Sequence, residues 1–76
     1  MNDLKKIIAE TFSVSIDSVG ENLVLRDLES WDSFNHMVFI VAVEQKFGVE
    51  LSADEIIRMQ SYKDACEILT GKLQAA

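Results

Sequence analysis

The stretch 33-SFNHMVFIVAVEQKFG-48 contains the longest uninterrupted apolar run of the chain, the seven residues from Met37 to Val43. With about 100° between successive residues of a helix, one set of its apolar side chains gathers on a single stripe. That stripe consists of Phe39, Ile40, Val43 and Phe47, with His36 at its edge. The stretch therefore predicts a helix from about Ser33 to Phe47 that packs this stripe against a core and ends at Gly48.

The same helix carries a second apolar face, formed by Phe34, Val38 and Val41 together with Gln45, roughly opposite the first. Two interpretations are open. Either the helix is central and buried all round, or the second face is an exposed apolar patch of the kind that marks a docking surface. We favour the exposed patch, because it begins beside the helix start at Ser33.

The rest of the chain predicts three further helices and no strand, since no segment alternates strictly between apolar and polar residues. The helices are expected over about Asp3–Phe12, from a Ser52–Glu55 capping box to near Met59, and from Ser61 onwards, fraying past Gly71. The three glycines are expected to punctuate helices as C-terminal stops. We predict an all-α fold, a small four-helix bundle of three principal helices and a short third one. A long loop, Gly20–Asp32, is pinned to the core by its leucines.

Composition narrows the class of protein. The 76 residues include 13 acidic and 7 basic ones, a net charge of −6, and 49% are apolar. This predicts one folded domain over residues 1–76, with little room for an enclosed active site. Acidity disfavours nucleic acid and favours basic partner surfaces. We expect no membrane insertion, because no apolar run is long enough to span a bilayer. Cys66 is the one cysteine, so we expect neither a disulfide nor a metal site. With no signal peptide evident, the sequence predicts a cytoplasmic protein.

The loop ends and the central helix begins at Asp32-Ser33. An aspartate or serine at a helix start is first of all a cap for the free backbone N–H groups. The same geometry exposes a serine hydroxyl at the positive end of the helix dipole, where a phosphate is electrostatically favoured.

At this junction the sequence resembles the acyl carrier protein family, whose signature is Asp-Ser-Leu followed by an apolar helix that ends in an acidic stretch and Phe. Asp32-Ser33-Phe34 and the segment Val43–Val49 carry the likeness, and Leu51–Ile57 and Ser61–Ala65 resemble the third and last helices. The resemblance implies that Ser33 accepts a covalent 4′-phosphopantetheine arm from coenzyme A, delivered by a separate phosphopantetheinyl transferase. The arm would hold acyl or aminoacyl thioesters for fatty-acid, polyketide or related biosynthesis, and Asp32 would support the site.

The chain also departs from the family pattern. Phe34 replaces the usual leucine, and Glu44 is the one carboxylate on a helix surface that is rich in acids in fatty-acid carriers. The stretch Trp31–Met37 resembles stand-alone carriers of specialised pathways. The resemblance implies a carrier that is not itself an enzyme, and we expect a monomer. Because of the departures, we expect it to dock its acyl- or aminoacyl-loading and acyl-processing enzymes through an apolar surface. The candidate docking residues are Phe34, Met37, Val38, Val41, Glu44 and Ile57.

Two other functions remain open on the residues alone. Ser33 and His36 are three apart and could form a nucleophile and base, although no acid that would orient the histidine is evident from the spacing. Alternatively, the chain is a helical interaction module that docks through Phe34, Val38 and Val41 without modification. Trp31 either anchors the loop or flanks the Ser33 site.

Overall fold

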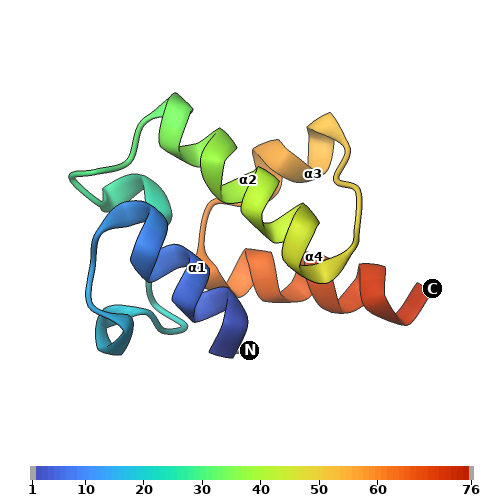
Figure 1. Cartoon of the computed structure of the whole chain (residues 1–76), viewed down its shortest axis with the longest axis horizontal. Helices are drawn as coiled ribbons and strands as arrows, with labels where there is room; N and C mark the ends of the chain where they lie inside the picture. The colour runs from blue at the N-terminus through green and yellow to red at the C-terminus, as the bar shows by residue number, and fades with distance from the viewer. Residues whose placement is uncertain (1, 76) are drawn as a thin grey trace.

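The apolar stripe of the central helix lies at the middle of the molecule. The structure is a computed structural model that describes residues 2–75. Within them the α-helices are α1 (Asn2–Phe12), α2 (Ser33–Phe47), α3 (Ala53–Arg58) and α4 (Tyr62–Ala75). Figure 1 shows α2 above α1 and α4, with α3 beside α2. The long connection between α1 and α2 lies at the end of the molecule opposite α3. The described helices confirm the predicted all-helical bundle with a short third helix.

The core is apolar throughout the described residues, which bury no polar or charged side chain. Its members come from every part of the chain: Leu4, Ile8, Phe12, Val19, Leu25, Phe39, Ile40, Val43, Leu51, Met59, Tyr62, Ala65 and Leu69. Phe39 of α2 lies against Phe12 of α1, with their ring centroids 6.0 Å apart. Removing these side chains from water supplies the main driving force for folding.

Both ends of α2 lie where the sequence predicts them. Asp32 caps the N-terminus, and Gly48 ends the helix with a left-handed φ of 66° while its N–H donates to the Glu44 carbonyl. A residue without Cβ adopts this conformation at little cost. The expectation that all three glycines end helices was wrong, because α4 continues through Gly71 to Ala75. Lys72, just beyond Gly71, pairs with Glu55 of α3, and this bond holds the last part of α4 against its neighbour.

The connection from α1 to α2 is fastened at several points. Two short 3₁₀ turns, η1 (Ile16–Ser18) and η2 (Leu25–Asp27), lie within it. Leu25 is fully buried, and Leu23 and Leu28 pack against the core, as predicted. The Leu25 N–H also donates to the Gln60 carbonyl at 2.8 Å, next to an isolated antiparallel bridge between Val24 and Ser61. The loop is therefore held against the turn between α3 and α4.

The short helix α3 depends on its cap and on one ion pair. Ser52 Oγ accepts from the Glu55 N–H, and Glu55 Oε1 accepts from the Ser52 N–H, completing the predicted capping box. The same carboxylate lies 2.8 Å from Lys72 Nζ of α4. The Lys72 ammonium and the Ser52 N–H lower the pKa of Glu55 from 4.5 to about 2. These bonds hold the start of α3 together and fasten it to α4.

The Glu55 contacts predict a pH-dependent part of the stability. Because folding lowers the pKa of this carboxyl, its contribution is complete above pH 4.5 and is lost as the pH falls through about 2. Glu55→Gln keeps an oxygen for the capping box but removes the charge. We expect the variant to unfold at lower urea concentration than the wild type at neutral pH, and the difference to disappear towards pH ~2.

Lys72→Gln removes the other charge of the pair. Its unfolding should also need less urea than that of the wild type at neutral pH, and this difference should likewise shrink as the pH falls. If the difference in urea midpoint between either variant and the wild type stayed constant over the whole acidic range, the lowered pKa of Glu55 would not be its cause.

Candidate functional site

Ser33 is the first residue of α2 and is exposed. Asp32 precedes it as the N-cap, and its Oδ1 accepts from the Asn35 N–H at 2.6 Å. Among residues 2–75, no hydrogen bond engages the Ser33 hydroxyl, whereas the Asp32 carboxylate is committed to the cap. The junction therefore presents a free hydroxyl on a rigid helix start, as the sequence predicted.

Asn35 fixes the approach to this junction, a role that the sequence did not indicate. Its Nδ2 donates to the Ser30 carbonyl at 2.8 Å, and Ser30 Oγ donates to the Phe12 carbonyl at 2.6 Å. The two bonds connect the start of α2 to the loop and then to the end of α1. Holding the backbone on both sides of Ser33 limits the positions that its hydroxyl can take.

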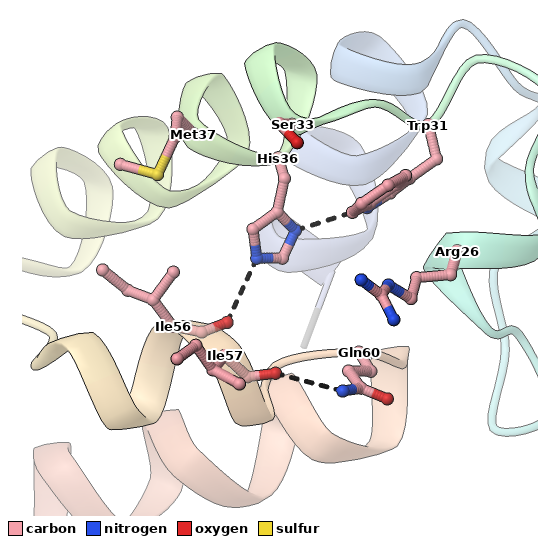
Figure 2. Close-up of a pocket in the computed structure, with 8 residues that line it drawn as sticks. All are labelled: Arg26, Trp31, Ser33, His36, Met37, Ile56, Ile57 and Gln60. Carbon is pink, nitrogen blue, oxygen red and sulfur yellow. Dashed lines mark hydrogen bonds between the residues drawn. The ribbon is translucent and has the colours of Figure 1, made fainter.

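A pocket of about 320 Å³ opens beside Ser33, between α2 and α3. It is lined by Arg26, Trp31, Ser33, His36, Met37, Ile56, Ile57 and Gln60 (Figure 2). Spacing alone could not place Arg26, Ile56 and Gln60 here, because they come from η2, from α3 and from the connection between α3 and α4. Apolar walls with a few polar groups are the usual lining of a site for a flexible organic ligand.

His36 forms one wall of this pocket and joins α2 to α3. Trp31 Nε1–H donates to His36 Nδ1 at 3.4 Å, and the other ring nitrogen lies 3.1 Å from the Ile56 carbonyl (Figure 2). An indole nitrogen only donates, so His36 Nδ1 accepts and Nε2 carries the proton that the Ile56 carbonyl accepts. Both nitrogens are engaged, which leaves none to act as a base for Ser33.

Trp31 both anchors the loop and lines the pocket, so the structure combines the two roles between which the sequence could not decide. Its ring lies beside the His36 ring, with the centroids 5.9 Å apart. The Arg26 guanidinium lies over the indole, 5.0 Å from the ring centroid. A cation held in this way on an aromatic face is partly ordered before any ligand arrives.

The second apolar face of α2 is exposed, so the helix is not buried all round. Phe34 is 75% exposed, and Met37, Val38 and Val41 are each more than two-fifths exposed. These four residues, which we call the α2 patch, line a shallow hollow of about 280 Å³. Ile57 of α3 is 68% exposed and faces the neighbouring pocket together with Met37.

Glu44, the remaining candidate docking residue, differs from the others in its surroundings. It is half-buried, and its Oε2 accepts from the Leu51 N–H at 2.9 Å. Its carboxylate therefore fastens the segment after α2, which leaves the α2 patch without a carboxylate of its own.

Other chemistry finds no support in the described part of the chain. Residues 2–75 bring no three His, Cys, Asp or Glu side chains together as metal ligands. None of the helices described there has the length and apolar character that crossing a bilayer needs.

Cys66 is partly buried against the core. Beside it, burial and the neighbouring thiol raise the pKa of Tyr62 to about 12.

Comparison with known proteins gives consistent likenesses. A family model described as "Phosphopantetheine attachment site" matches residues 2–69. An acyl carrier protein of Lactobacillus acidophilus is 37% identical over 65 residues, covering 84% of this chain and 80% of that protein. An acyl carrier protein of Zymomonas mobilis is 36% identical over 62 residues, covering 82% of this chain and 80% of that protein. The solution NMR structure of a holo acyl carrier protein from Geobacter metallireducens has the same fold, with a TM-score of 0.84 over 97% of this chain and 85% of that one, at 22% identity.

The cap at Asp32 predicts a measurable share of the stability of α2. Replacing a capping aspartate by alanine leaves a backbone N–H at the helix start without its side-chain partner and typically costs about 1 kcal/mol. We expect Asp32→Ala to lower the free energy of unfolding by about that amount, and Asp32→Asn, which still accepts the Asn35 N–H, by a few tenths. Urea unfolding followed by helical circular dichroism measures both. An Asp32→Ala variant as stable as the wild type would show that the cap is dispensable.

Proposed function

The chain belongs to the acyl carrier protein family, and we propose that Ser33 is the residue at which it carries its 4′-phosphopantetheine arm. The observation that carries this proposal is the free, exposed Ser33 hydroxyl at the start of α2, behind the Asp32 cap and beside the pocket. The family match confirms the resemblance predicted from Asp32-Ser33-Phe34. A phosphopantetheine arm is the covalent cofactor of this family.

The surroundings of Ser33 fit such an arm. The hydroxyl is free to form a bond, and the pocket next to it offers apolar side chains from α2 and α3. Gln60 Nε2 donates to the Ile57 carbonyl at 3.2 Å, so its amide oxygen remains to accept a hydrogen bond from an amide of the arm. When bound, the arm supplies a terminal thiol that holds an acyl group as a thioester.

Attachment requires help from a partner enzyme. Ser33 Oγ would attack the phosphorus of coenzyme A that bears the pantetheine, forming an O–P bond while the pyrophosphate bond breaks and adenosine 3′,5′-bisphosphate leaves. The serine proton must go to a base, and both nitrogens of the neighbouring His36 are engaged. The phosphopantetheinyl transferase therefore supplies that base, and the carrier supplies a positioned hydroxyl.

We further propose that the α2 patch is the surface on which the transferase and the acyl- or aminoacyl-processing enzymes dock, with Ile57 at its border. These side chains are exposed, apolar and adjacent to Ser33, so a partner that covers them also reaches the attachment site. The net charge of −6 contributes long-range attraction to basic partners. Contact through apolar side chains fits a carrier of a specialised cytoplasmic pathway better than a general partner set.

Modification of Ser33 is tested directly by intact mass. The apo protein, incubated with coenzyme A and a promiscuous phosphopantetheinyl transferase, should gain the mass of one phosphopantetheine. Ser33→Ala should gain none. Ser18→Ala, which removes an exposed hydroxyl distant from Ser33 in the sequence, should be modified like the wild type. Fragmentation should place the added group on residue 33.

If folded wild-type protein stays unmodified with several transferases, the proposal fails. The unmodified interaction module would then be the better description of the α2 patch.

The docking role of the α2 patch predicts that Val38→Glu weakens the reaction with the transferase. Burying a new carboxylate against an apolar partner surface is costly, so we expect the KM for the apo carrier to rise about tenfold, equivalent to ~1.4 kcal/mol. Gln45→Glu is the matched control. It adds the same charge at an exposed position of α2 beyond the patch and should change KM less than about twofold.

Helical circular dichroism should be unchanged in both variants. Equal kinetics for Val38→Glu and the wild type would remove Val38 from the docking surface.

A further inference from the structure

Among residues 2–75, Arg26 is the only charged side chain that lines the pocket beside Ser33. It takes part in no ion pair within residues 2–75, where the pairs are Arg58–Asp54 and Lys72–Glu55. We propose that Arg26 binds the phosphodiester that joins the arm to Ser33, an inference that rests on the proposed attachment at that residue.

The charges at the helix start explain why a cation is needed there. A phosphodiester on Ser33 would add a negative charge next to the Asp32 carboxylate, with Glu29 a few residues earlier in the same loop. The Asn35 N–H, one of the groups at the helix N-terminus that could receive an anion, already donates to Asp32 Oδ1 at 2.6 Å. The added anion therefore meets like charge and a partly occupied helix end, and a guanidinium relieves both.

The position of Arg26 is set by two features. Leu25, its neighbour in η2, is fully buried, and its N–H donates to the Gln60 carbonyl, so the Arg26 side chain departs from a fixed backbone. Its guanidinium rests 5.0 Å from the Trp31 ring centroid. Figure 2 shows it reaching from η2 towards the interior of the pocket, while Ser33 lies at the rim formed by α2.

A planar guanidinium suits this task. It offers several N–H donors in one plane, matches two phosphate oxygens at once and keeps its charge at every physiological pH. Stacking on Trp31 reduces the rotamer freedom that pairing would cost. The bound phosphodiester would then direct the first bonds of the arm towards Trp31 and the α2–α3 pocket rather than into solvent.

A carboxylate on the cargo is the other anion that could reach Arg26. The phosphodiester is the stronger candidate, because it is present in every loaded form and is bonded directly to a residue that lines the same pocket. This choice predicts that the arm with a free thiol, carrying no cargo, is already sensitive to Arg26.

The experiment uses the holo protein with a free thiol, once intact mass has shown one arm on Ser33. We expect the ³¹P resonance of the wild-type phosphodiester to be displaced from that of free phosphopantetheine and to return towards it as salt rises from about 0.05 M to about 1 M. In Arg26→Gln the displacement and its salt dependence should be lost, and in Arg26→Lys they should be partly kept. Arg58→Gln, which removes an exposed arginine on α3, should behave as the wild type.

Trp31 is the only tryptophan of the chain, so its fluorescence provides a second readout. Conversion of apo to holo protein should change the emission of the wild type, because the phosphodiester pairs with the guanidinium that lies on the indole ring, and should leave that of Arg26→Gln unchanged. The wild-type salt titration needs no variant and therefore tests the inference even if Arg26→Gln folds poorly.

Identical ³¹P spectra for wild type and Arg26→Gln would overturn the inference. So would an effect of Arg26 that appears only when the thiol carries a succinyl group and not the neutral butyryl group, since Arg26 would then bind cargo. If no holo protein forms, the proposed attachment at Ser33 fails and the inference fails with it. The mass measurement thus separates that outcome from a failure of the Arg26 contact alone.

Discussion

Burial of the Phe39–Ile40–Val43 stripe of α2 is the constraint on which the rest of the structure depends. Phe39 packs against Phe12 of α1, and all three side chains belong to the core that Ala65 and Leu69 of α4 share. A helix that commits one stripe to a core turns its opposite side outwards. On most surface helices that opposite side is polar. On α2 it carries Phe34 and Val38, so the packing that makes the bundle also displays the α2 patch next to Ser33.

The same packing explains why the proposed attachment site at Ser33 can be rigid without being enclosed. The Asp32 cap sets the residue at which α2 begins, and the hydrogen bonds through Asn35 and Ser30 fasten that start to the end of α1. On the other side of the pocket, the bond from His36 to the Ile56 carbonyl holds α3 in place. Under the proposed function, a hydroxyl on such a frame needs no catalytic group beside it, because partner enzymes would provide the chemistry.

The features that the sequence predicted are those determined by neighbours along the chain. The bounds of α2, the Ser52–Glu55 capping box and the exposed second face all follow from helical spacing and cap residues. The sequence did not predict the pocket lining, because Arg26 and Gln60 are brought together by the bridge between Val24 and Ser61. The prediction that Gly71 ends a helix was wrong because it considered only neighbours along the chain. α4 continues through Gly71 to Ala75, and Lys72 just beyond it pairs with Glu55 of another helix.

Net charge and surface composition act at different distances in this molecule. An exposed apolar surface that includes Phe34 and Ile57 favours self-association, whereas a net charge of −6 makes copies of the chain repel one another. Repulsion acts over about 10 Å at an ionic strength of about 0.1 M, and apolar contact acts only where surfaces touch. Under the proposed docking role, the charge would keep carriers apart and draw basic partners near, while the carboxylate-free α2 patch would discriminate among those that arrive. Selectivity would then depend on the shape of an apolar contact and be less sensitive to salt than pairing between charges.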